Sequence, residues 1–246
     1  MAQLASITGG RRIVCVAAAM ICGTGVAVAT PISPAAERIA QRIDSLDVEN
    51  HWPAGIHVKW DTGLPDGRPE KLPGKHTHCS AFVAAAASEV GVYILRPPEH
   101  SQVLLANAQY DWLEQEGATR GWKPLGSAEE AQVHANEGWL VVAAYKNHHD
   151  DKPGHIAIVR PSDKRGDTVR EEGPQITQAG GTNYRSVALR VGFGGHPAAW
   201  GRHEVRFYAH AVDGVMRWPF AAQWHRGAKS SSGACPDRAR RLRYHV

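Results

Sequence analysis

One cysteine and one histidine occupy positions at which a protein chain gives such residues chemical reactivity. Cys79 precedes a run of alanines with high helix propensity and follows the helix-breaking pair Pro73 and Gly74, so we expect it in the first turn of a helix. There, unpaired backbone N–H groups and the positive end of the helix dipole favour the thiolate and lower the pKa of the thiol. Because a thiolate attacks carbonyl carbon atoms, Cys79 is the candidate nucleophile.

His155 is the candidate base for that thiol. It follows a Pro-Gly pair and opens the segment HIAIV, which has the composition of a strand. Side chains alternate along a strand, so His155 and Ala157 share one face, while Ile156 and Ile158 share the other. We expect the small Ala157 side chain to let a helix approach the His155 face closely. The alternative is a buried structural cysteine and an ordinary histidine at a strand end, but the two positions together favour catalysis.

A catalytic imidazole needs a neighbour that accepts a hydrogen bond from its outer N–H and fixes its plane. The short segment QITQA at residues 175–179 is predicted as a strand, and Gln178 within it has a side-chain carbonyl that can accept this bond. The alternative role for Gln178 is to satisfy backbone groups in a glycine-rich turn. Both roles are compatible with the sequence.

Two of these segments resemble a known family. The motifs HCSAFVAAA (78–86) and PGHIAIVRP (153–161) are similar to those of the NlpC/P60 and CHAP groups of papain-like cysteine peptidases, which cleave amide bonds in bacterial cell-wall peptidoglycan. The resemblance spans about residues 73–184. It implies an α+β papain-like fold in which an N-terminal catalytic helix packs on a small antiparallel sheet. It also implies that Cys79 is the nucleophile, His155 the base, and a polar residue on the next strand the partner of His155.

The chain departs from the NlpC/P60 pattern at three places. Members of that family usually have Asp before the cysteine and Gly two residues after it, where this chain has His78 and Ala81. These two departures leave the subfamily, and hence the bond cleaved, open. The third catalytic place usually holds a histidine, whereas the segment ITQAG puts Gln178 there. Papain itself uses an asparagine at this place, which makes Asn183, a short turn further on, the second candidate.

The expected substrate-binding residues are His78, Ser80, Trp60 and Asn183. The first two flank the nucleophile, and Trp60 lies in a segment rich in Gly and Pro at residues 50–73. We expect that segment to wrap over the core as a long loop and to form one wall of a cleft. The glycine-rich stretch at residues 192–201 is expected to rim the same cleft.

Two clusters raise the question of a metal. His76, His78 and Cys79 could form part of a zinc site, but the chain has no second pair of ligands at the usual spacing. The polar loop at residues 148–151 contains two histidines and two aspartates, yet neighbouring ligands in a loop seldom converge without a distant partner. We therefore predict no metal site, and the expected chemistry uses no cofactor.

The first residues of the chain have the pattern of a secretory signal peptide. Arg11 and Arg12 precede an uncharged apolar run at residues 13–29, which ends in the small-residue motif AVA. A membrane anchor is the alternative, but the run is short and interrupted by glycine. Cleavage after residue 29 would place the protein in the periplasm or outside the cell, without an integral membrane segment.

Signal cleavage would leave two cysteines. Cys235 follows a serine-rich linker in a basic tail, which is a poor position from which to bridge a core helix, so we expect Cys79 to be free. The predicted organisation is a signal peptide (1–29), a papain-like catalytic domain (30–215) and a basic C-terminal tail (216–246).

The chain of 246 residues carries a formal net charge of +4 and has a pI near 8.9. A mildly basic protein suits anionic wall polymers, and the sequence lacks the interleaved basic and aromatic residues of nucleic-acid binders, so no nucleic acid is expected. Hydrophobic periodicity predicts helices at residues 34–46, 98–116 and 127–136 and strands at residues 139–145, 155–160, 175–179 and 203–211.

These features together predict a secreted cysteine hydrolase that cleaves amide bonds in peptidoglycan stem peptides, as an endopeptidase or an amidase. Peptidoglycan is the expected partner, and an inhibitor or immunity protein is a further candidate. The alternatives are a non-catalytic cell-wall-binding module, a protein-directed cysteine protease or acyltransferase, and a zinc hydrolase centred on His76, His78 and Cys79.

Overall fold

The computed structural model describes residues 29–68 and 76–214 of the chain. Residues 1–28 of the predicted signal peptide and the whole predicted basic tail, including Cys235, lie outside the described residues. The predicted domain boundaries therefore stay predictions. Within the described ranges, no helix combines the length and the apolar character that crossing a bilayer requires.

The centre of the fold is a six-stranded sheet in which every neighbouring pair is antiparallel. The strand order is β1-β6-β2-β3-β4-β5. The central strands β2 and β3 are buried at every position, because helices cover both faces of the sheet. The strands are β1 (Trp122–Leu125), β2 (Leu140–Tyr145), β3 (His155–Val159), β4 (Gln175–Gln178), β5 (Tyr184–Ala188) and β6 (Arg206–His210).

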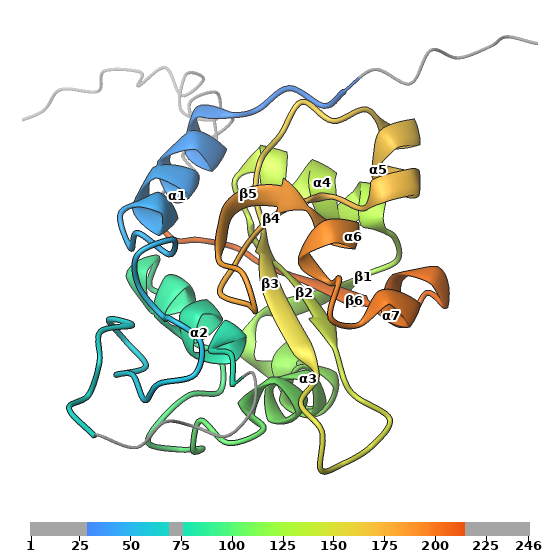
Figure 1. The fold of residues 1–246 in the computed structure, drawn as a ribbon. Coiled ribbons are helices and arrows are strands. Elements are labelled where there is room, and N and C mark those ends of the chain that lie inside the picture. Colours follow the sequence, from blue (N-terminus) through green and yellow to red (C-terminus); the bar gives the residue numbers. More distant parts are fainter. Residues whose placement is uncertain (1–28, 69–75, 215–246) are drawn as a thin grey trace, which may run out of the picture.

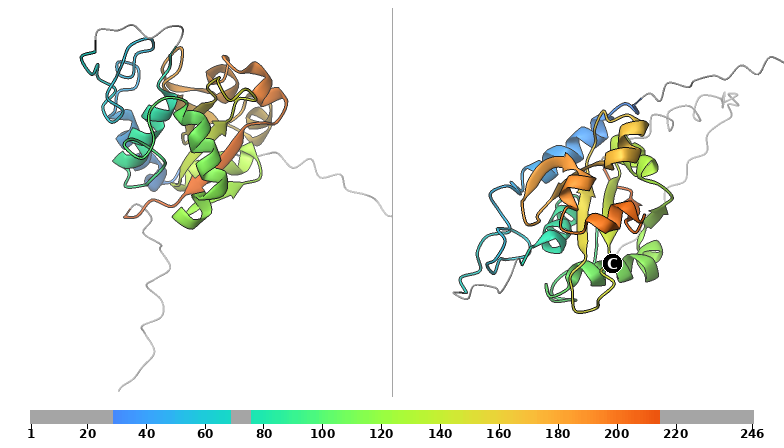
Figure 2. Two further views of the ribbon diagram at one scale, coloured as in Figure 1. Left: turned by 90° about the horizontal axis from the view of Figure 1, so that it is seen from below. Right: turned by 45° about the vertical axis from the view of Figure 1, so that its right-hand side comes forward.

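Two groups of helices enclose this sheet (Figures 1 and 2). The first three helices contribute to one hydrophobic cluster, and the last four contribute to a second cluster on the opposite face. The α+β expectation is confirmed, and the arrangement is consistent with a papain-like NlpC/P60-type fold. The helices are α1 (Pro34–Asp44), α2 (Cys79–Glu89), α3 (Leu105–Gln115), α4 (Ala128–Glu137), α5 (Gly166–Glu172), α6 (Leu189–Gly192) and α7 (Pro197–Gly201), with a 3-10 turn at Gly117–Arg120.

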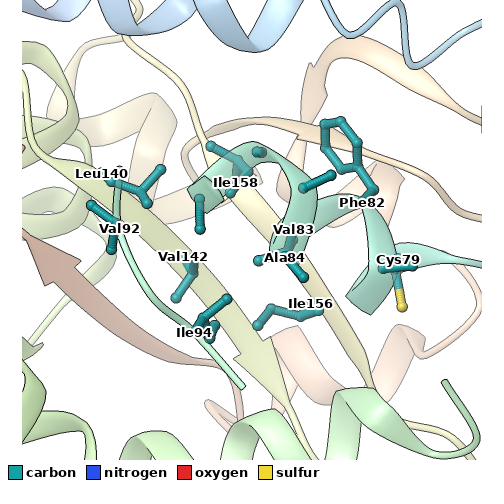
Figure 3. Packing of buried hydrophobic residues seen from close by; sticks show 14 of the residues in the cluster. Cys79, Phe82, Val83, Ala84, Val92, Ile94, Leu140, Val142, Ile156 and Ile158 are labelled. Atoms are coloured by element: carbon teal, nitrogen blue, oxygen red, sulfur yellow. The ribbon is translucent and has the colours of Figure 1, made fainter. Parts of the chain in front are cut away.

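Helix α2 packs on β3 through small side chains, and its residues are buried from Cys79 to Ala87. Its alanines leave room for Ile156 and Ile158, which point from β3 into the same cluster (Figure 3). We expected a helix to approach the face of β3 that carries His155 and Ala157. This expectation is wrong for α2, which packs on the face that carries Ile156 and Ile158. Ala157 belongs to the cluster of α4 to α7 on the opposite face, as the alternation of the strand requires.

The long loop that follows α1 covers α2, as predicted for the described part of residues 50–73. Trp52 is fully buried and meets the ring of Phe82 edge-on, with ring centroids 5.3 Å apart. Its indole N–H donates to the carbonyl of Trp60 at 3.1 Å. Gly63 faces the indole so closely that an added Cβ would lie 2.2 Å from it, which only glycine permits. The loop thus covers one side of α2.

Some element boundaries differ from the sequence-based expectations. The helix predicted from residue 98 begins at Leu105, because Leu104 adopts a left-handed conformation with φ 51°. Residues 162–173, for which no helix or strand was predicted, contain α5, and the glycine-rich stretch at 192–201 contains α7. Strands β1 and β5 were not predicted from the sequence. They are the two edges of the sheet, and their partly exposed residues show no apolar alternation.

Candidate active site

Cys79 is the first residue of α2, as predicted, and its side chain is free and only 3% exposed. The backbone N–H groups of Ser80 and Ile156 both donate hydrogen bonds to its sulfur, and the His155 side chain is hydrogen-bonded to it. The sulfur therefore lies beside the first residues of β3. The hydrogen-bond donors around it stabilise a thiolate.

His155 opens β3 opposite Tyr145 of β2. Its Nε2 atom lies 2.7 Å from Oε1 of Gln178 and donates to it, which leaves Nδ1 for the sulfur of Cys79. The ring edge of Phe193 packs against the imidazole, with centroids 4.6 Å apart and planes at 81°. The imidazole is thus fixed on three sides, by the sulfur, the amide and the phenyl ring.

Gln178 is 2% exposed, and its amide orientation is set by a second contact. Its Nε2 atom donates to the carbonyl of Thr182 at 3.3 Å, so Oε1 must face His155. Two glycines lie close to this amide. A Cβ added to Gly180 would lie 2.7 Å from the amide nitrogen, and one added to Gly192 would lie 2.7 Å from the amide oxygen. Side chains at these two positions would displace the partner of the histidine.

Asn183, the second candidate for that partner, is engaged elsewhere. Its side-chain N–H groups donate to the carbonyls of Val48 at 2.9 Å and His51 at 2.7 Å, and its oxygen accepts from the N–H of Gly180 at 3.0 Å. Asn183 therefore ties the turn after β4 to the loop after α1. Of the two candidates, only Gln178 contacts His155 in the structure.

Burial and charge coupling have opposite effects on the pKa values of Cys79 and His155. Burial by itself would raise the pKa of the Cys79 thiol, but the charge and hydrogen bond of His155, with the two backbone N–H groups, hold that pKa below its usual value. Burial would likewise lower the pKa of His155, but the thiolate and the Gln178 carbonyl raise it above its usual value. Both shifts favour the thiolate and the imidazolium over the neutral pair.

A cavity of about 540 Å³ opens beside the imidazole. His155 and Gln178 line it together with His196, whose ring stacks on that of His155 with centroids 6.0 Å apart and planes at 29°. The glycine-rich stretch predicted to rim a cleft does so, because Gly192, Gly194 and Gly195 also line this cavity. A substrate in the cavity would meet the imidazole directly.

The structure places the remaining predicted substrate-binding residues away from this cavity's lining. His78 is buried and donates from Nε2 to the carbonyl of Ile56 at 2.8 Å, and burial lowers the pKa of its imidazole. Ser80 is buried in α2, where its carbonyl accepts from Gln109 at 3.1 Å. Trp60 packs on the core beneath the guanidinium of Arg96, which lies 5.5 Å from the ring centroid. Their role in substrate binding stays a prediction.

The two histidine clusters considered as metal ligands have protein contacts of their own. In the described part of the chain, no three His, Cys, Asp or Glu side chains gather closely enough to hold a metal ion. His78 contacts Ile56 as described above, and Nε2 of His148 lies 3.0 Å from Oε1 of Glu204.

Asn107 of α3 is a buried polar residue that sequence analysis did not select. Its side-chain oxygen accepts from the N–H of Gly154 at 2.8 Å and from that of Asn147 at 3.3 Å, and its amide donates to the carbonyl of Lys152 at 2.9 Å. It thereby fixes the loop that ends at His155. A buried asparagine in an apolar helix face was the available signal, but its partners lie some 40 residues away in sequence.

Replacing Asn107 by alanine is expected to lower the free energy of unfolding by about 2–3 kcal/mol, because it leaves the buried N–H of Gly154 without an acceptor. Urea denaturation would measure the change. Asn50→Ala is the matched control, since the Asn50 amide is exposed and, among the described residues, its hydrogen bonds go to the Asp47 carboxylate; this change should cost about 0.5 kcal/mol or less. Equal stability of the two variants would contradict the anchoring role.

Two substitutions of Gln178 with opposite expected effects on the pKa of His155 test the contact between these residues. Gln178→Ala removes an acceptor that raises the pKa of His155, so that pKa should fall and the imidazolium should lose its proton at lower pH. Gln178→Glu adds a negative charge and should move the same pKa upward. The rate of Cys79 alkylation by iodoacetamide, measured against pH, should show its alkaline transition shifted down in the first variant and up in the second. Shifts in one common direction would contradict the assigned contact.

Comparison of the sequence with known proteins identifies one relative of known activity. No known protein-family profile matches the chain. Over 100 residues, which are 41% of this chain and 52% of the relative, the sequence is 36% identical to peptidoglycan amidase Tse1 of Pseudomonas aeruginosa. The chain thus matches about half of the length of that relative. With the α+β fold and the cysteine and histidine motifs, this identity makes the chain a distant homologue of a peptidoglycan amidase.

Proposed function

We propose that this protein is a cysteine hydrolase that cleaves amide bonds in peptidoglycan stem peptides through Cys79, His155 and Gln178. The observation that carries the proposal is the contact of a helix-start thiol with an imidazole that is itself oriented by a buried amide, beside an open cavity. The similarity to a peptidoglycan amidase supports the wall polymer as the substrate class.

The proposed reaction follows from the ion pair. The Cys79 thiolate attacks the amide carbonyl, and the His155 imidazolium gives its proton to the leaving nitrogen, so that an acyl-enzyme and a free amine form. His155 then takes a proton from water, which attacks the thioester and releases the acid. Gln178 keeps the imidazole in plane during both proton transfers.

The negative oxygen of the tetrahedral intermediate needs hydrogen-bond donors that are fixed in advance. The backbone N–H of Cys79 is one of the first N–H groups of α2, which have no acceptor within the helix. It also lies next to the reacting sulfur. We propose it as one donor for this oxygen.

Digestion of purified sacculi tests the proposal. Wild-type protein should release muropeptides, and mass spectrometry of the products identifies the amide bond and so decides between an endopeptidase and an amidase. Casein should stay intact in parallel reactions. Cleavage of casein alone would point to a protein-directed protease, and sedimentation with sacculi without any product would point to a wall-binding module; either outcome would overturn the proposal.

The proposed site of action is the periplasm or the cell exterior, where peptidoglycan is accessible. The apolar run and the AVA motif at residues 13–29 support export. Fractionation of cells that express the whole chain, followed by N-terminal sequencing of the exported form, would test both export and cleavage after Ala29.

A further inference from the structure

The cavity beside the active pair lies on the imidazole side. Its lining includes His155, Gln178 and His196, whereas Cys79 is buried and is not among the lining residues. In amide cleavage by a thiolate, the acyl part of the substrate becomes bonded to sulfur, and the amine part receives its proton from the imidazole. The leaving nitrogen must therefore come within hydrogen-bonding distance of His155, on the side where the cavity opens.

The glycines that line this cavity fall into two kinds. Gly180 and Gly192 are required by packing, since a Cβ at either position would lie 2.7 Å from the Gln178 amide. Gly181 and Gly195 are different, because a Cβ at either position would meet no atom within 4 Å and neither glycine adopts a left-handed backbone. Packing does not explain these two glycines. They leave bare backbone and free space on the wall of the cavity.

The residues that line the cavity indicate which class of ligand it can bind. Within the described residues, the lining contains no Asp or Glu, so a positive charge on the ligand would find no opposite charge there, and protonated His155 would repel it. The other polar side chains of the lining are those of Thr77, Gln178, Thr182, Tyr184 and His196. Burial and the charge on His155 also lower the pKa of His196, which favours a neutral ring. Such a surface suits a peptide segment that forms hydrogen bonds and carries no positive charge.

We propose that this cavity binds the leaving-amine segment of the substrate, a peptide without positive charge, against the open wall at Gly181 and Gly195. The inference rests on the proposed amide hydrolysis. As the sulfur–carbon bond forms and the carbon–nitrogen bond breaks, the electron pair of the broken bond goes to nitrogen, which takes the proton of His155. The amine leaves through the cavity, and the water that releases the acyl group enters by the same route.

The test uses two synthetic amides with one acyl segment in common, taken from a stem peptide. The first is a primary amide, whose leaving group is ammonia, and the second has an uncharged tripeptide as its leaving amine. Gly195→Val should lower the ratio of kcat/KM for the tripeptide amide to that for the primary amide roughly tenfold or more, because the valine occupies space that only the larger leaving group needs. Gly181→Val should act in the same direction.

Gly201→Val is the matched control, because Gly201 also has free space around its Cβ position but does not line the cavity. Its ratio should equal that of the wild type, and thermal unfolding should show that all three variants are folded. An unchanged ratio in both Gly181→Val and Gly195→Val would overturn the inference while leaving amide hydrolysis intact. If the wild type cleaves neither amide nor sacculi, the proposed function fails, and the inference fails with it.

A third amide tests the charge preference. Its leaving tripeptide carries one lysine and is otherwise the same as the neutral one. The wild type should cleave the neutral amide with the higher kcat/KM, because the lining offers no carboxylate to pair with the ammonium group. Equal or faster cleavage of the lysine-containing amide would overturn the assignment of a segment without positive charge.

Discussion

Replacing Cys79 by alanine is expected to lower the rate of amide hydrolysis by about 10⁴-fold or more, because it removes the sulfur that forms the proposed acyl intermediate. The substitution removes one buried sulfur at the start of α2 and adds no bulk, so the fold should persist. Release of soluble muropeptides from purified sacculi measures the activity, and circular dichroism measures the helix content.

Cys235→Ala is the matched control for this variant, since it removes a thiol from the predicted basic tail instead of from α2. It should retain wild-type activity. Undiminished lysis by Cys79→Ala would remove the nucleophile assignment, and modification of Cys235 alone by a thiol reagent on the native protein would contradict the reactivity of Cys79.

Replacing His155 by alanine is expected to cost nearly as much, because the imidazole both holds the thiolate and delivers the proton to the leaving nitrogen. Without it, burial dominates and the pKa of the Cys79 thiol rises, so little thiolate is present at neutral pH. The Cys79→Ala, His155→Ala double variant should be no slower than the slower single variant, since residues that act as a unit are not additive. Sacculus digestion by the three variants measures this.

His149→Ala is the control for the second prediction. His149 is exposed in the loop between β2 and β3, six residues before His155, and its loss should leave activity unchanged. A double variant that is slower than either single variant by the product of the two separate effects would contradict a coupled pair and would indicate that the two residues act independently.

Local sequence signals located the catalytic candidates without knowledge of the fold. The alanine run predicted a helix that begins near Cys79, and the Pro-Gly pair with the apolar alternation predicted a strand that opens with His155; the structure has both elements. These signals depend on backbone preferences and on side-chain periodicity within about ten residues. For the same reason, the buried strand β2 and the capping of α4 by Ser127 could also be predicted.

The sequence did not indicate which residue contacts the histidine. Gln178 and Asn183 were both compatible with the spacing, and only the turn after β4, with the loop after α1 packed against it, directs Gln178 to His155 and Asn183 to Val48 and His51. A local sequence pattern likewise could not predict which face of the sheet α2 packs on. Alternation separates Ala157 from Ile156 and Ile158, but it does not say which set faces the helix.

The cavity depends on tertiary structure for the same reason. Its wall joins residues just before β3, in the turn after β4 and between α6 and α7, and the glycines that leave it open look the same in sequence as those required by packing. The sequence by itself thus determined which reactive side chains the chain has and the elements that start with them. Only the tertiary structure decided which side chains meet and where space is left between them, because contacts between segments far apart in the chain depend on how all of the elements pack together.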